Sequence, residues 1–255
     1  MVDINDFPQQ RRHTYYFLKD ASNTAPVLLT TKVDMSAMEK SRASLKTEGV
    51  NVSYIAFLIK AISVVIKQYP QANASMLDGW RPKIARYERV IAKFTLDKHD
   101  AGERLVASAV IEDSDLLGEY DIQREIERFK NADYSDADEY NNLRRLNSLK
   151  KQVGQWLYRK LMSNPNKRHA IQGSFTITSL GHRPVDVFCP ISSNCIAFGV
   201  GAIQDSAVVM GGEITVRPML PLSMVFDHRV IDGAMAADIL HDIKNVIEQY
   251  QFPLK

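Results

Sequence analysis

The sequence predicts an α/β protein in which one sheet packs against helices. Residues 52–69 are apolar nearly all round, which indicates a helix buried against a sheet. The last third of the chain is a series of short apolar runs separated by turn residues, a pattern typical of strands. Residues 234–250 then carry apolar side chains at helical spacing. We therefore expect a single domain over residues 13–255, preceded by a mobile N-terminal arm over residues 1–12.

Strand-like runs account for much of the chain. Residues 27–33 are rich in β-branched side chains and predict the first strand. The runs 89–96 and 105–111 flank a charged turn and predict a hairpin or a pair of adjacent strands. Gly211-Gly212 is a direct hairpin signal between two later runs. The remaining predicted strands are 174–178, 195–201, 207–210, 213–216 and 219–226.

Helical signals alternate with these strands. Pro70 ends the buried helix predicted over 52–69, because proline cannot continue a helix. The region 119–162 carries two apolar stripes separated by an acidic break at 133–139, which predicts two amphipathic helices with solvated outer faces. The other predictions are a helix over 37–46, a turn at 164–166 and a basic loop at 167–169.

The composition narrows the possible partners. The 32 basic and 30 acidic side chains leave a net charge of +2, which gives no sign of a nucleic-acid or membrane partner. Cys189 and Cys195 are too few for a disulfide framework and lack zinc-ligand spacing, so no metal site is expected and Cys195 is predicted to be a buried free thiol. Without a signal peptide or a membrane-length apolar run, a cytoplasmic protein is expected.

One stretch, Phe226 to Ala234, concentrates the residues suited to chemistry. His228 and Asp232 lie between an apolar run that predicts a strand and a segment with helical spacing, so both lie on a short strand-to-helix connection. Such a connection presents a histidine to a cleft while its flanking elements stay rigid, and the imidazole pKa lies near neutrality. The alternative for an isolated histidine is a core residue satisfied by a nearby carboxylate, for which Asp227 and Asp232 are available.

The same stretch carries a family resemblance. Asp-His-Arg-Val-Ile-Asp-Gly at 227–233 resembles the active-site signature of the acyltransferase components of 2-oxo acid dehydrogenase complexes. Its shorter core, His-x-x-x-Asp-Gly, also occurs in chloramphenicol acetyltransferases and in the condensation domains of peptide synthetases. Further support comes from Gly-Ser-Phe-Thr-Ile-Thr-Ser-Leu-Gly at 173–181 and from family-like residues in order between His13 and Leu77.

The resemblance implies a chloramphenicol acetyltransferase-like two-layer fold, with a mixed β-sheet flanked by helices. It also implies a homotrimer with active sites at subunit interfaces, in which Thr178 and His228 of one site come from different subunits. The condensation domains fuse two such units to form one cleft, whereas this chain holds one unit and is expected to borrow its second wall.

The resemblance assigns roles to individual residues. His228 is expected to be the general base for the incoming acceptor, in a direct transfer without an acyl-enzyme. The oxyanion donor is expected at Thr178, where the family usually has serine, with Ser179 beside it as a further substrate-binding candidate. Asp232 is expected to brace the loop around His228 through an ion pair with Arg229 or with an arginine from elsewhere.

The expected function is a free-standing acyltransferase acting between a thioester and a thiol, amine or hydroxyl acceptor. The thioester is expected on coenzyme A or an acyl carrier protein, as substrate, and no covalently bound cofactor is expected. Since residues 1–12 are too short to fold as a lipoyl module, the acyl group is expected to arrive in trans. The alternative is a non-catalytic trimeric scaffold or core protein of a 2-oxo acid dehydrogenase-like assembly.

Two departures from the family pattern concern the substrate entrance. Residues 191–194, Ile-Ser-Ser-Asn, stand where the family usually has Asn-Pro, and the helical stretch 131–170 is longer than the usual connection. The identity of the acceptor is therefore not carried over from the family.

Overall fold

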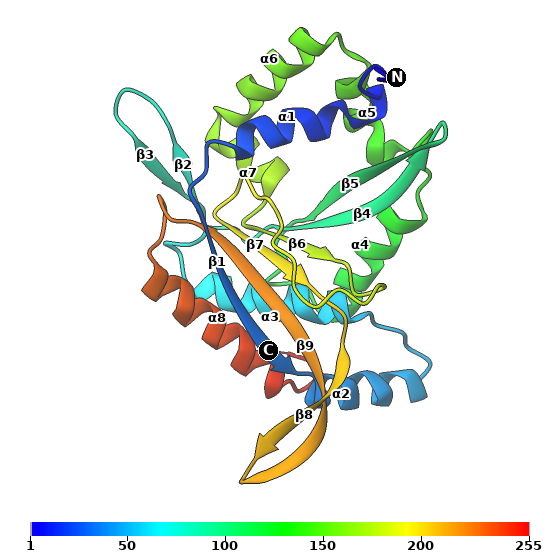
Figure 1. The fold of residues 1–255 in the computed structure, drawn as a ribbon, viewed down its shortest axis with the longest axis vertical. Helices are drawn as coiled ribbons and strands as arrows, with labels where there is room; N and C mark the ends of the chain where they lie inside the picture. Colours follow the sequence, from blue (N-terminus) through cyan, green and yellow to red (C-terminus); the bar gives the residue numbers. More distant parts are fainter. Residues whose placement is uncertain (1, 255) are drawn as a thin grey trace.

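A computed structural model describes residues 2–254 (Figure 1). The first half comprises η1 (Gln9–Arg11), α1 (Arg12–Ala21), β1 (Pro26–Asp34), α2 (Ser36–Thr47), α3 (Tyr54–Gln68), β2 (Ala74–Leu77), β3 (Lys83–Arg86), β4 (Ala92–Asp100) and β5 (Glu103–Ile111). The second half comprises α4 (Glu119–Asn131), η2 (Asp138–Tyr140), α5 (Asn141–Ser148), α6 (Lys151–Met162), α7 (Pro165–Gln172), β6 (Phe175–Ser179), β7 (Ile196–Val200), β8 (Gln204–Met210), β9 (Glu213–Asp227) and α8 (Gly233–Glu248).

A seven-stranded mixed sheet organises the molecule, in the order β1-β9-β7-β6-β4-β5 with β8 also paired to β9. The pairs β4/β6 and β6/β7 are parallel and the other pairs are antiparallel. A separate hairpin, β2/β3, projects beside it. The predicted fold class, a mixed sheet flanked by helices, is confirmed.

The main core lies between this sheet and the helix pair α3 and α8, which run side by side in Figure 1. The side chain of Ser53 caps α3 by accepting a hydrogen bond from the backbone N–H of Ala56. Phe57 and Ile62 of α3 are fully buried and belong to the same core as Phe198 and Phe226 of the sheet. The apolar helix predicted over 52–69 therefore has the buried position that its composition indicated.

One predicted break in the sheet is wrong. The runs 213–216 and 219–226 form the single strand β9, which contains Pro218 and Pro221. In the strand ladders Pro218 pairs with β8 and Pro221 with β1, while on the other side their carbonyls accept from the backbone N–H groups of Met35 and Gly201 at 2.9 and 3.1 Å. Met35 and Gly201 directly follow β1 and β7, so each proline lacks its N–H at a place where a neighbouring strand ends. A missing donor is tolerated there, and β9 continues through both prolines.

The helical region differs from the prediction in its number of helices. Three helices, α4, α5 and α6, occupy the region where two were predicted, although the acidic break at 133–139 is confirmed between α4 and α5. The predicted basic loop at 167–169 is wrong, because these residues lie in α7. Asn164 caps that helix and Pro165 opens it, so the turn predicted at 164–166 is the start of a helix.

The end of the predicted N-terminal arm is folded onto α5. Gln9–Arg11 form η1, and the Arg12 guanidinium donates to the carbonyls of Asn147 and Leu149 at 3.2 and 2.8 Å. The buried Asn147 side chain accepts from the backbone N–H of His13 at 2.8 Å and donates to the carbonyl of Gln10 at 2.8 Å. One asparagine therefore joins η1, α1 and α5.

Two further sequence predictions concern the cysteines and membrane-spanning segments. Cys195 is a buried free thiol, as predicted, and burial raises its pKa. Among the helices that the structure describes, none has both the length and the apolar character needed to cross a bilayer.

Replacing Asn147 by alanine tests the junction between η1, α1 and α5. We expect the free energy of unfolding to fall by about 1–3 kcal/mol, because the His13 N–H and the Gln10 carbonyl lose their buried partner. Chemical denaturation measures the change. Asn142→Ala in the same helix, where the side chain is exposed, is the matched control and should shift the midpoint little. Equal stability of the two variants would contradict the assigned role.

Candidate active site

His228 follows the last residue of β9 and precedes α8, on the strand-to-helix connection that the sequence predicted. Its backbone N–H donates to the carbonyl of Ala25 at 2.9 Å, which extends the β1/β9 ladder to the histidine itself. The ring is exposed and lies 5.7 Å from the ring of Phe226, centroid to centroid. The alternative of a core histidine satisfied by a carboxylate is wrong, since His228 is exposed and pairs with no carboxylate among residues 2–254.

The carboxylate that organises this connection is Asp227. It is buried and accepts hydrogen bonds from the backbone N–H groups of Ala25 and Arg229 at 3.2 and 3.1 Å. The Arg229 guanidinium adds an ion pair, with its Nη2 2.7 Å from Oδ2 of Asp227. Burial raises the pKa of this carboxyl, but the hydrogen bonds from Arg229 and Ala25 outweigh burial and leave the pKa lowered. His228 thus lies between Asp227 and Arg229, which are joined by an ion pair.

Arg229 also links this connection to the β2/β3 hairpin. Its Nη1 lies 3.2 Å from a carboxylate oxygen of Asp78, which follows β2. The Asp78 side chain is 61% exposed, so this pair is much weaker than the buried pair with Asp227. The hydrogen bonds and ion pairs of Arg229 therefore fix the backbone on both sides of His228.

The predicted ion pair between Asp232 and Arg229 is wrong. Asp232 is exposed, and its Oδ1 accepts from the backbone N–H of Met235 at 2.9 Å as the N-cap of α8. Among residues 2–254 it forms no ion pair, and Arg229 pairs with Asp227 instead. The physical reason is position: Asp227 ends a buried strand and needs a cation, whereas Asp232 meets the free N–H groups of a helix start.

Thr178 lies near the end of β6, on the sheet face opposite the main core. Its neighbours in the strand, Ile177 and Phe175, point into that core. Thr178 is half-buried, and its Oγ1 accepts a hydrogen bond from the hydroxyl of Thr95 on β4 at 3.1 Å. Ser179 is exposed at the strand end, where its hydroxyl accepts from the backbone N–H of Gly181 at 3.3 Å.

Thr178 and His228 are not brought together within one chain. The sheet register places Thr178 opposite Gly199 on β7 and Gly199 opposite Ser223 on β9, five residues before His228. At about 3.3 Å per residue and about 4.8 Å between strands, the two residues lie roughly 19 Å apart. A base and an oxyanion donor that act on one carbonyl must both reach it within hydrogen-bond distance.

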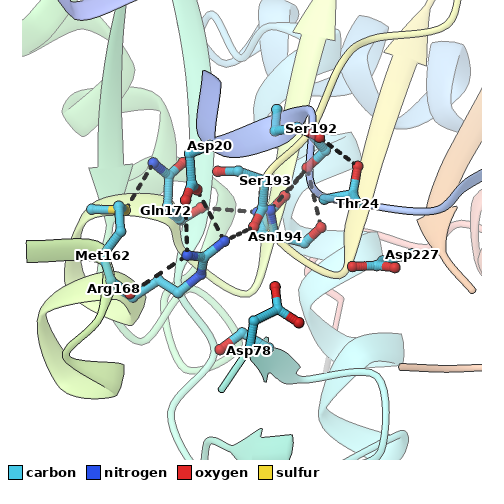
Figure 2. A network of polar contacts seen from close by, with 12 residues as sticks. Asp20, Thr24, Asp78, Met162, Arg168, Gln172, Ser192, Ser193, Asn194 and Asp227 are labelled. Atoms are coloured by element: carbon cyan, nitrogen blue, oxygen red, sulfur yellow. Dashed lines mark hydrogen bonds and ion pairs between the residues drawn. The ribbon is translucent and has the colours of Figure 1, made fainter. Parts of the chain in front are cut away.

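Residues 191–194, where the sequence departs from the family pattern, form part of a buried polar network (Figure 2). Asn194 donates to the carbonyl of Gln172 at 2.9 Å and to the hydroxyl of Thr176 at 3.1 Å, and Arg168 donates to the carbonyl of Ser193. Arg168 also pairs with Asp20 of α1 at 3.1 Å. The segment therefore joins α1, α7 and the sheet, and only Ile191 in it is exposed.

Lys93 lies beside this network on β4. It is buried, and its Nζ donates to Oε1 of Gln172 at 2.6 Å. Burial and the nearby Arg168 lower the pKa of this amine to about 8.

The sequence analysis names Asp227 only as a possible partner of His228, and it does not identify Thr95. Asp227 precedes His228 directly and follows the apolar run 219–226, a position that indicates a buried carboxylate. Thr95 carried no signal in the linear sequence, because only the pairing of β4 with β6 places it beside Thr178. Among the described residues, no group of three His, Cys, Asp or Glu side chains forms a metal-binding cluster.

Replacing the two aspartates separates their roles. We expect Asp227→Asn to lower the free energy of unfolding by about 3 kcal/mol, near the low end for a buried pair because Arg229 is partly exposed. Asp232→Asn should be nearly neutral since asparagine caps helices equally well, and Asp232→Ala should cost about 1 kcal/mol. Thermal unfolding of the three variants measures the order, and a greater loss in Asp232→Asn than in Asp227→Asn would contradict it.

The acid side of the stability profile adds a second check on Asp227. Because its pKa is lowered by folding, its stabilising contribution is complete above about pH 4, the pKa of an unfolded aspartate. The contribution is lost as the pH falls through the folded-state pKa. Asp227→Asn should therefore lose less stability than the parent chain between neutral pH and about pH 3.

Comparison with known proteins places these residues in a family. The model of the 2-oxoacid dehydrogenases acyltransferase (catalytic domain) family matches residues 5–137 and 144–254. The interval between them covers η2 and the start of α5. Tyr140 of η2 is buried and donates to the carbonyl of Phe129 at 2.5 Å. This unmatched interval lies within the helical stretch 131–170, for which a greater length than in the family is predicted.

Two curated relatives have similar sequences. The dihydrolipoyllysine-residue acetyltransferase component of the pyruvate dehydrogenase complex of Bacillus subtilis is 28% identical over 92% of this chain and 48% of its own length. The dihydrolipoyllysine-residue succinyltransferase component of the 2-oxoglutarate dehydrogenase complex of Bartonella vinsonii is 29% identical over 91% of this chain and 50% of its own. The chain thus spans about half the length of these relatives.

Solved structures share the fold. The cubic core of a pyruvate dehydrogenase multienzyme complex matches with a TM-score of 0.70 and 25% identity, over 96% of this chain and 92% of that chain. A probable dihydrolipoamide acetyltransferase of Listeria monocytogenes matches with a TM-score of 0.73 and 21% identity, over 99% and 96%. A chloramphenicol acetyltransferase matches over 96% and 98% with a TM-score of 0.50 and 14% identity. With its sheet, its Asp-His-Arg connection and a family match over nearly its whole length, this chain belongs to the acyltransferase catalytic-domain family of the 2-oxo acid dehydrogenases.

Proposed function

We propose that this chain transfers an acyl group from a thioester to a thiol, amine or hydroxyl acceptor, with His228 as the general base. The observation that carries the proposal is the position of His228, exposed on a backbone fixed by the buried Asp227–Arg229 pair. A base must keep its orientation while both substrates come and go. A histidine placed for packing alone would not combine an exposed ring with so strongly bonded a backbone.

The transfer proceeds in one ternary complex. A ring nitrogen of His228 accepts the proton of the acceptor as its sulfur, nitrogen or oxygen attacks the thioester carbonyl. The carbonyl oxygen becomes an oxyanion, which the Thr178 hydroxyl stabilises by donating a hydrogen bond. The C–S bond of the thioester then breaks, and the departing thiolate takes the proton from His228. All protons balance without an acyl-enzyme.

Two copies of the chain supply one site in this proposal. His228 and Thr178 of a single copy lie roughly 19 Å apart by the sheet register, too far for one carbonyl to meet both. A homotrimer in which each His228 faces the Thr178 of a neighbour satisfies both requirements. Self-association agrees with the similarity to the cubic core of the pyruvate dehydrogenase complex.

The substrates follow from the relatives in general terms. Their names describe acetyl and succinyl transfer involving dihydrolipoyllysine. We therefore propose acetyl- or succinyl-coenzyme A, or the corresponding carrier thioester, as one substrate and a dihydrolipoyl or other small nucleophile as the other.

Replacing His228 by alanine tests the base. We expect transfer, followed as coenzyme A release from acetyl- and succinyl-coenzyme A with dihydrolipoamide, amine and alcohol acceptors, to fall by about 10²–10⁴-fold. His241→Ala on the exposed face of α8 is the matched control and should keep the parent rate. Full activity of the His228 variant would remove the histidine from the chemistry. A folded parent chain inactive with every pair would favour the non-catalytic scaffold.

The assembly is tested separately by light scattering at the concentration of the activity assay. We expect the mass of a trimer, or of a multiple of three chains. Mixing His228→Ala chains with Thr178→Val chains should restore part of the activity, because some interfaces then combine an intact His228 with an intact Thr178. Full activity from a species of monomer mass would contradict the shared site.

A further inference from the structure

A row of small polar positions crosses the sheet at the level of Thr178. The strand register aligns the row from β1 through β9, β7, β6 and β4 to β5. It consists of Thr30, Ser223, Gly199, Thr178, Thr95 and Ser108. Directly opposed residues of neighbouring strands point to the same face of a sheet, so these hydroxyls share the face opposite the main core.

The row is covered at one part and accessible at another. The Ser223 hydroxyl donates to the carbonyl of Phe188, and a side chain at Gly199 would collide with that same carbonyl, so the chain around Phe188 lies on this part of the sheet. Thr178 and Thr95, in contrast to Ser223, are each half-buried, so part of each side chain is accessible to solvent. The two threonines therefore combine restricted mobility with access from outside.

The hydrogen bond between these threonines has a direction. The Thr95 hydroxyl donates to Oγ1 of Thr178 at 3.1 Å, so Thr178 is the acceptor. Among residues 2–254, no group accepts a hydrogen bond from the Thr178 hydroxyl itself. A hydroxyl has one proton and two lone pairs. Thr178 therefore uses a lone pair within the protein and keeps its proton available.

We propose that Thr95 is a positioning residue that holds the Thr178 hydroxyl as a ready oxyanion donor, and this inference rests on the proposed function. Threonine has a branched Cβ and few χ1 rotamers, and only some of them present the hydroxyl to a bound thioester. The bond from Thr95 selects one rotamer and occupies one lone pair, which directs the remaining proton away from β4. A donor fixed before the charge develops needs no reorganisation during the reaction.

Thr95→Val tests the proposal, because valine keeps the branched shape and removes the hydroxyl. We expect kcat to fall about three- to tenfold with little change in KM, since a neutral hydrogen bond of ordinary strength is lost. Thr95→Ser should recover most of the rate. Ser108→Ala, the neighbour of Thr95 on β5, is the control for loss of a hydroxyl from this row and should keep the parent kcat.

The decisive measurement is the same substitution in a Thr178→Val background. We expect Thr95→Val to have no further effect there, because its partner hydroxyl is already gone. An equal loss in both backgrounds, or a loss explained by a lower Tm, would overturn the positioning role. An unaffected Thr95→Val enzyme would overturn it as well, while a large loss in Thr178→Val would leave the proposed function standing. If Thr178→Val is itself fully active, the oxyanion assignment fails and this inference fails with it.

Discussion

The buried ion pair between Asp227 and Arg229 is the interaction on which the candidate site depends. A carboxylate at the end of a buried strand loses its hydration and is stable there only with compensating donors. Arg229 and the backbone of Ala25 supply these donors. Asp227 and Arg229 flank His228, and Ala25 directly precedes β1. The hydrogen bonds that stabilise the buried Asp227 carboxylate therefore fix the end of β9, the residue before β1 and the backbone of His228 at the same time.

The sheet then sets the distance between the catalytic candidates. Its central strands β6 and β7 are parallel to each other, and β7 is antiparallel to β9. The C-terminal ends of β6 and β9 therefore point in opposite directions along the strands. Thr178 lies near one end and His228 follows the other. No adjustment of side chains removes a separation set by strand register. Oligomerisation is thus a geometric requirement of the proposed chemistry, in addition to a property suggested by related structures.

Local signals in the sequence were sufficient for most elements and failed where tertiary partners decide. Ser53 and the apolar run after it define α3, and Gly211-Gly212 defines the β8/β9 turn. Asn164-Pro165 fits both a turn and a helix start, and in the structure it begins α7. By contrast, the choice of partner for Arg229 depends on burial. Two aspartates flank Arg229 at short range, and in the folded chain Asp227 is buried whereas Asp232 is exposed.

The same distinction explains why Thr178 was found and Thr95 was not. Position 178 was identified through a resemblance that runs along the chain, whereas Thr95 lies 83 residues away and meets it only through a parallel pairing. Serine at position 178 would reach several rotamers easily, and threonine restricts them because its methyl group competes for the same space. The orientation of the hydroxyl in a site built on threonine therefore depends more on neighbouring residues. Here the neighbouring strand β4 supplies the Thr95 hydroxyl, which contacts the Thr178 hydroxyl directly.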